Sequence, residues 1–70
     1  MRGVPDNIVA FYHGYGIAIE RSPTWANPYR CTYPIYDGEK RRHSGWTSIE
    51  TSKLMIDVML RVGLWKEIER

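Results

Sequence analysis

The sequence predicts a small α+β fold, in which one C-terminal helix packs on one face of an antiparallel meander of three to four strands. Apolar residues alternate with small or polar ones along much of positions 8–46, which is the period of a β-strand. An Asp37-Gly38 pair within that region predicts a tight chain reversal. A capped apolar segment over about 48–62 predicts the helix. A chain of 70 residues can build one core, so we expect a single domain over 1–70.

The first two strands are expected over about 8–13 and 15–21. From Tyr15 onward the large residues fall on alternate positions, with small or charged residues between them, which predicts a strand with one apolar face. Gly14 interrupts the run. It is compatible with a bulge in one long strand or with a His13-Gly14 hairpin turn, and the residues do not decide between the two.

The next two strands are expected over about 29–36 and 39–46, after a loop that contains two prolines. Pro34 cannot donate a ladder hydrogen bond, so the strand has an edge or a bulge at that position. If Asp37 and Gly38 are the two residues of a type I′ turn, the residues on either side of the turn pair in order outward from it. That register pairs Tyr36 with Glu39, Ile35 with Lys40, Tyr33 with Arg42 and Tyr29 with Trp46.

The helix has a predicted beginning and a predicted end. Thr47 and Glu50 fit a capping box, in which the Thr47 hydroxyl accepts a hydrogen bond from the Glu50 amide. Gly63 supplies the left-handed residue that ends many helices, with Leu64 placed for the apolar contact of a Schellman motif. Between these ends the segment is apolar over more than half its circumference, which is wider than a small sheet needs.

Composition and motifs argue against several classes of protein. The chain has 10 Lys and Arg, 8 Asp and Glu, and a formal charge of +2. Cys31 is its only cysteine, which favours a reducing compartment. Pro5 and Asp6 stand where a signal peptide needs an uninterrupted apolar stretch, and no uncharged apolar run is long enough to span a membrane. Zinc, dinucleotide and nucleophile-elbow motifs are absent. We therefore expect a cytoplasmic, non-enzymatic binding protein without cofactor or metal.

The leading hypothesis for function is an accessory protein that binds DNA or RNA. Residues 40–43 form the one dense cationic run, Lys-Arg-Arg-His. In the register above, part of this run shares a polar sheet face with residues of the preceding strand, and the small Gly16 and Ala18 leave room over that face. Such side chains bind phosphate and stack on bases. The candidate nucleic-acid-binding residues are Arg30, Thr32, Tyr36, Arg41 and His43.

The alternative hypothesis is a protein–protein adaptor or inhibitor that acts through its helix and its aromatic residues, as a homodimer or with another protein. Three Trp and five Tyr, together with the broad apolar face of the helix, exceed what one small core can bury. Trp and Tyr are also the residue types enriched at interfaces. The candidate interface residues are Trp25, Leu54, Val58 and Trp65.

Overall fold

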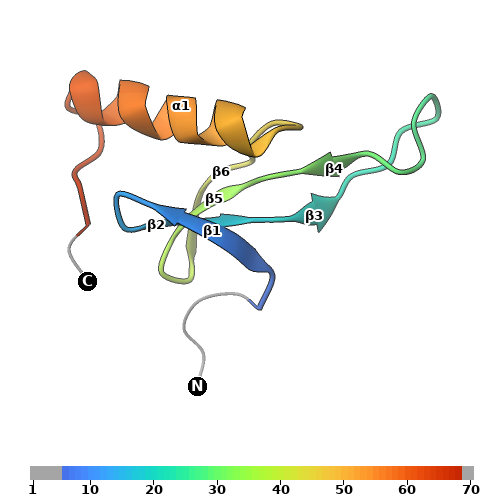
Figure 1. The fold of residues 1–70 in the computed structure, drawn as a ribbon, viewed down its shortest axis with the longest axis horizontal. Coiled ribbons are helices and arrows are strands. Elements are labelled where there is room, and N and C mark those ends of the chain that lie inside the picture. Colours follow the sequence, from blue (N-terminus) through green and yellow to red (C-terminus); the bar gives the residue numbers. More distant parts are fainter. Residues whose placement is uncertain (1–5, 69–70) are drawn as a thin grey trace.

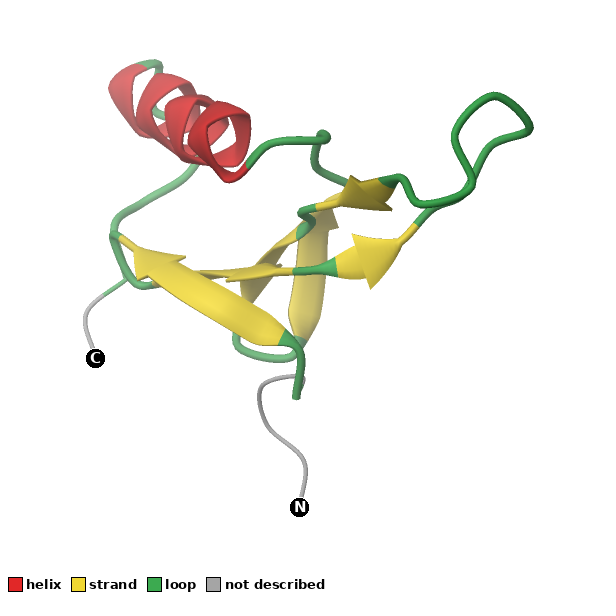
Figure 2. Ribbon diagram, turned by 45° about the vertical axis from the view of Figure 1, so that its right-hand side comes forward, coloured by secondary structure: helices red, strands yellow, loops and turns green. Residues whose placement is uncertain are grey.

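The structure, a computed structural model, describes residues 6–68 and confirms the small α+β fold (Figure 1). Within this part of the chain, six strands precede one helix. The elements are β1 Ile8–Tyr12, β2 Tyr15–Ala18, β3 Glu20–Arg21, β4 Cys31–Thr32, β5 Ile35–Asp37, β6 Lys40–His43 and α1 Ile49–Arg61. The main sheet has four antiparallel strands in the order β1-β2-β5-β6, and α1 lies over one of its faces (Figures 1 and 2).

Two of the predicted strands are each divided in two. The expected strand over 15–21 becomes β2 and β3, and the expected strand over 29–36 becomes β4 and β5. The break falls where Ala18 N–H still donates to Pro34 O over 2.9 Å but Pro34 has no N–H to return. Beyond it, β3 and β4 form a separate two-stranded ribbon that extends away from the helix and the main sheet (Figure 2).

The turn between β1 and β2 is a hairpin turn, which decides between the two alternatives for Gly14. Tyr12 pairs with Tyr15, so His13 and Gly14 are the two turn residues. Their φ angles are +52° and +84°, and positive values at both positions are the signature of a type I′ turn. A bulge does occur nearby, at Val9, where the register shifts between Ile8 and Ala10.

The predicted register of the β5–β6 hairpin is wrong, because the turn lies one residue later than expected and the partner of Tyr36 moves from Glu39 to Arg41. Asp37 pairs with Lys40 and Tyr36 with Arg41, so the turn residues are Gly38 and Glu39. Only Gly38 needs a positive φ, +64°, in this arrangement, which is the pattern of a type II′ turn with glycine first. A further shift between Ile35 and Tyr36 brings Ile35 opposite His43. Arg42 therefore lies in a bulge, and β6 stays at the edge of the sheet as expected.

The helix begins one residue later than the capping box predicts. Ser48, not Thr47, is the N-cap, and its hydroxyl accepts a hydrogen bond from Thr51 N–H over 3.4 Å. The Schellman ending is confirmed, since Gly63 N–H donates to Leu60 O and Leu64 N–H to Met59 O. No helix among the described residues has the length and apolar character that a membrane crossing requires.

The core lies between the helix and the sheet and is completed by the segment after the helix. Its buried residues are Tyr15, Ile17, Ile35, Ile56 and Trp65. The predicted role of Trp65 at an interface is wrong, because its exposed fraction is only 8% and its ring packs 5.0 Å from that of Tyr15. The Tyr15 hydroxyl also donates to Lys66 O over 2.7 Å. The terminal segment thus forms one wall of the core.

Candidate functional site

The most exposed aromatic residues lie on the ribbon formed by β3, β4 and the loop between them. We call residues 20–32 the aromatic arm. Trp25 lies in the loop of the arm, which projects from the body of the protein (Figure 1). The Trp25 side chain is 100% exposed and that of Tyr29 is 84% exposed. The prediction that Trp25 is available to a partner is therefore compatible with its position, and Tyr29 joins it.

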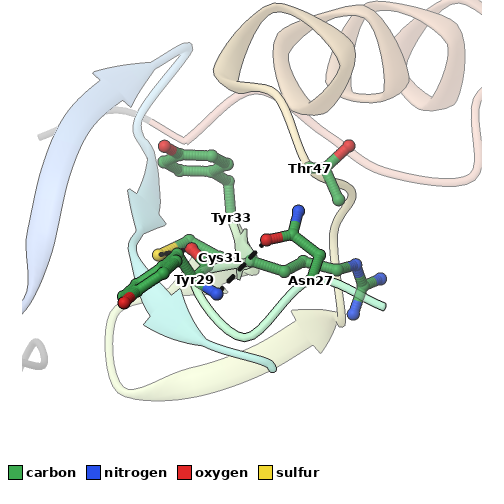
Figure 3. A pocket seen from close by; sticks show the side chains of 6 residues that line it. Asn27, Tyr29, Cys31, Tyr33 and Thr47 are labelled. Atoms are coloured by element: carbon green, nitrogen blue, oxygen red, sulfur yellow. Dashed lines mark hydrogen bonds between the residues drawn. The ribbon is translucent and has the colours of Figure 1, made fainter. Parts of the chain in front are cut away.

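The arm loop is held by its own hydrogen bonds. Thr24 and Asn27 exchange backbone hydrogen bonds of 3.0 and 3.2 Å, and the Thr24 hydroxyl also accepts from Asn27 N–H. The Asn27 side chain accepts from Tyr29 N–H over 3.2 Å (Figure 3). At the base of the loop, the Arg30 guanidinium donates to the carbonyl and hydroxyl oxygens of Ser22. The loop presents Trp25 from an ordered turn, which lowers the entropy lost on binding.

A shallow concavity of about 490 Å³ lies between the arm and the residues that precede α1 (Figure 3). Its lining combines aromatic rings, a guanidinium, a thiol and an amide. The lining residues are Asn27, Tyr29, Arg30, Cys31, Tyr33 and Thr47. The Tyr33 backbone there is fixed on both sides, since its N–H donates to Trp46 O and its carbonyl accepts from the buried Ser52 hydroxyl over 2.7 Å.

Part of the predicted nucleic-acid surface does come together on the sheet face opposite the helix, which we call the open sheet face. Tyr36 and Arg41 pair across the strands and lie on the same side. Both contact Glu20: Arg41 Nη1 donates to its carboxylate over 2.9 Å, and the Tyr36 hydroxyl donates over 3.3 Å. Thr32 is the strand partner of Glu20 and so shares its side of the ribbon. A carboxylate therefore neutralises the cation at the centre of this surface.

The remaining members of the predicted surface lie elsewhere or are engaged. Arg30 bonds to Ser22 at the base of the arm, as described above. His43 does not lie on the open sheet face, because it pairs with the core residue Ile35. Its ring stacks on Trp46 at 4.3 Å, and its Nδ1 accepts from Gly45 N–H over 2.9 Å. The bulge at Arg42 is the cause, since one extra residue sends His43 to the helix side.

Gly16 and Ala18 do not leave space for a ligand. Both are buried, and a side chain added at Gly16 would meet Ile8 and Phe11. Phe11 pairs with Gly16 across the strands and covers it, while remaining 59% exposed itself. The open sheet face therefore presents the ring of Phe11 where the sequence predicted an opening.

The outer face of α1 is partly apolar and exposed. Leu54 is 59% exposed and Val58 36%, in agreement with their predicted availability, and Val62 continues the row at 60%. Glu50 in the first turn and Arg61 in the last turn are exposed on the same side of the helix. Neither forms an ion pair with another residue in the described part of the chain.

A second polar cluster surrounds the β1–β2 turn. The His13 imidazole lies 3.6 Å from Asp57 of α1 and 3.4 Å from Glu67 of the terminal segment. The Tyr12 hydroxyl donates to both oxygens of the Asp57 carboxylate over 3.0 Å. This hydrogen bond is the main reason that the pKa of Tyr12 is raised, with burial and the negative charge of Asp57 adding to it. The cluster fastens the hairpin to the helix and to the terminal segment.

Three residues that contribute to these surfaces are not among the predicted site residues: Glu20, Tyr29 and Val62. A signal existed for Glu20, because it shares strand parity with Gly16 and Ala18 and so belongs to the same face. Tyr29 was predicted to lie in a strand over 29–36, whereas β4 begins at Cys31 and Tyr29 lies in the loop before it. Val62 belongs to the broad apolar face of the helix, and local pattern alone does not separate the buried part of that face from the exposed part.

Within residues 6–68, no group of three or more His, Cys, Asp or Glu side chains is arranged to hold a metal ion. Comparisons with protein-family models, with curated proteins and with solved structures find no match to this chain. The surfaces described above are therefore the basis for any functional assignment.

Proposed function

We propose that this chain is a small, non-enzymatic binding module that docks on another protein through its aromatic arm, as an adaptor or an inhibitor. The single observation that carries the proposal is the complete exposure of Trp25 on a loop that is ordered by its own hydrogen bonds. Leaving a whole indole in water is unfavourable for an isolated protein, and covering it on a partner recovers that free energy.

The neighbours of Trp25 support a protein partner. Trp, Tyr and Arg are the residue types that most often dominate binding energy at protein interfaces. The arm carries all three types in Trp25, Tyr29 and Arg30, and Tyr29 and Arg30 line the concavity. A projecting ring next to a shallow recess fits a partner that offers a groove for the ring and a polar ridge for the recess.

The non-enzymatic part of the proposal is supported by the surroundings of the two histidines. His13 lies in a hairpin turn between two carboxylates that belong to the helix and the terminal segment, apart from the residues that line the concavity. His43 is stacked on Trp46 and bonded to the backbone of Gly45. Both rings serve contacts within the fold.

The test combines photo-crosslinking with a matched set of variants. A photoreactive phenylalanine analogue at position 26, beside Trp25 in the same exposed loop, is used to capture partners in cells, and the captured protein is then purified and titrated directly. We expect Trp25→Ala to weaken binding about 30-fold or more, as a hot-spot residue worth roughly 2 kcal/mol does. Phe11→Ala is the control, because Phe11 is an exposed ring on a different surface. Equal binding by the Trp25→Ala variant and the parent would refute the proposal.

A second candidate is nucleic-acid binding by the open sheet face, and one observation favours it. Phe11, Tyr36 and Arg41 share that face, and Gly16 pairs with both Phe11 and Tyr36, so the two rings stand on either side of a glycine. Aromatic rings beside a cation are the usual means of holding single-stranded nucleic acid. Glu20 acts against phosphate binding here, because its carboxylate occupies Arg41.

Glu20 also provides the test of this second candidate. Fluorescence anisotropy with short single strands and duplexes of DNA and RNA measures affinity as salt is varied. If the open sheet face binds nucleic acid, Glu20→Gln releases Arg41, raises the affinity and steepens the salt dependence by about one phosphate contact. Affinity that is unchanged by Glu20→Gln, or that does not depend on salt, argues against nucleic acid as the partner of this face.

A further inference from the structure

We propose that two copies of this chain associate through the outer faces of their α1 helices, packed antiparallel about a twofold axis. This surface is distinct from the aromatic arm, so the inference does not depend on the partner proposed above. It rests on four exposed residues that run along one face of the helix in the order acid, apolar, apolar, base: Glu50, Leu54, Val58 and Arg61.

That order is self-complementary when a second helix runs in the opposite direction. A twofold axis midway between Leu54 and Val58 places Leu54 of one copy against Val58 of the other, and the reverse. The same axis brings Glu50 of each copy beside Arg61 of its partner, which forms two equivalent ion pairs at the rim. An isologous interface requires this property, in which each residue of a patch finds its complement in the same patch of the other copy.

The spacing along the helix agrees with this arrangement. With about 1.5 Å of rise per residue, Glu50 lies about 9 Å from the level of the axis and Arg61 about 7.5 Å on the other side. The mismatch of about 1.5 Å is small against the reach of a glutamate and an arginine side chain. The pairs therefore form without any shift of the apolar contact at the centre.

The residues beside the central pair extend the apolar contact. Val62 follows Val58 by one turn and is 60% exposed, and the same axis sets it against Thr51 of the other copy, which carries no charge. Leu64, just beyond the helix, is 70% exposed. Lone exposed apolar residues are ordinary on a monomer, whereas a row of them bordered by charged residues agrees with the apolar centre and polar rim of an interface. One helix pair buries a modest area, so we expect a reversible dimer.

The test is sedimentation velocity of the full chain over a wide concentration range. We expect a concentration-dependent dimer whose dissociation constant rises at least about tenfold in Leu54→Glu, which puts two charges into the centre of the contact. Trp25→Ala is the matched control and leaves the dissociation constant unchanged, because the arm takes no part. This control also separates a failure of the dimer from a failure of the arm-based function.

Charge exchange gives the decisive result. Glu50→Arg and Arg61→Glu each place like charges opposite one another and weaken the dimer several-fold, whereas the double variant restores it. Mixing the two single variants yields a heterodimer, because each supplies the charges that the other lacks. A stability effect would run the other way, since both substitutions oppose the helix dipole and the double variant is then the least stable.

Circular dichroism of each variant confirms that the helix is intact, and all of the substituted residues are exposed. The inference is overturned if the chain is monomeric at every concentration, if Leu54→Glu leaves a dimer unaffected, or if the double charge exchange dimerises no better than the single variants.

Discussion

Trp25 and Trp65 show at the residue scale how differently one residue type is used in this chain. Trp65 is 8% exposed, contacts Tyr15 and has the Arg42 guanidinium 5.0 Å from its ring centroid. Trp25 is completely exposed. We expect Trp65→Ala to lower the free energy of unfolding by about 3–5 kcal/mol, because it removes a large buried side chain. Trp25→Ala is expected to change it by less than about 0.5 kcal/mol.

Urea unfolding followed by circular dichroism measures both changes. A loss of 3–5 kcal/mol is a large part of the stability of so small a domain, so the Trp65→Ala variant will be partly unfolded without denaturant (about 5–15 kcal/mol is typical of whole domains). Equal stability of the two variants would mean that the terminal segment does not pack on the core in solution.

Tyr12 is the residue for which the structure predicts a dependence on pH. Its pKa is raised above 10.0 because its hydroxyl donates to the Asp57 carboxylate, and burial and the charge of Asp57 raise it further. A pKa raised by folding means that the folded state binds the proton more tightly. The resulting stabilisation is present in full below pH 10.0 and is lost as the pH rises through the folded-state pKa.

Comparison with Tyr12→Phe tests this directly. The difference in unfolding free energy between the parent and this variant is expected to be constant at neutral pH and to shrink above pH 10.0. Tyr29→Phe serves as the control, because Tyr29 is 84% exposed and lies far along the chain from Asp57. A difference that stays constant through the alkaline range would contradict the hydrogen bond between Tyr12 and Asp57.

At the scale of elements, the start of α1 can be located by a pair of substitutions. Ser48→Ala removes the side-chain oxygen that accepts from Thr51 N–H, and is expected to cost about 1 kcal/mol. Thr47→Ala, one residue earlier, is expected to cost less than about 0.5 kcal/mol because Thr47 lies outside the helix. Thermal unfolding separates them, since 1 kcal/mol shifts the midpoint by about 4–8 °C at this size. The reverse order would support the capping box at Thr47.

The hairpins show how far local pattern can determine a fold. The elements and their order were predictable, because alternation, two turn glycines and a helix stop are all local signals. The register of β5 and β6 was not. In the observed turn only Gly38 adopts a positive φ, so Asp37 does not need the left-handed conformation. The bulge at Arg42 places its guanidinium close to both the Asp37 carboxylate and the ring of Trp65. Trp65 lies far along the chain from the turn, so the turn preferences of residues 37–40 cannot predict its effect on the register of β5 and β6.

The candidate surfaces were predictable where they depend on local sequence pattern, and were not predictable where they depend on strand register. Leu54 and Val58 on the helix and Trp25 in a proline-containing loop are local features, and they are exposed as expected. The polar surface was only half predicted, since its composition depends on the strand register. Glu20 reaches Arg41 because two separate hairpins bring them together. Such neutralisation is a tertiary property that a count of cationic residues does not reveal.

The whole molecule divides into a packed body and an arm, and this division predicts how it opens. The body holds the buried residues, whereas the arm loop has almost none and is secured by short-range hydrogen bonds. Native-state hydrogen exchange is therefore expected to show early exchange of amides in the arm, with small opening free energies. Amides of β2 and β5 are expected to exchange only through global unfolding. Uniform protection across both parts would show that the arm and the body open together.

The contact between Tyr15 and Lys66 joins residues that are synthesised at different times. Tyr15 leaves the ribosome early, yet the carbonyl that accepts its hydroxyl belongs to Lys66, added 51 residues later. Trp65, which packs on the same ring, arrives equally late. The core around Tyr15 therefore cannot close until residues 65 and 66 have been synthesised, although the hairpins and the helix that form the rest of it precede them in the chain.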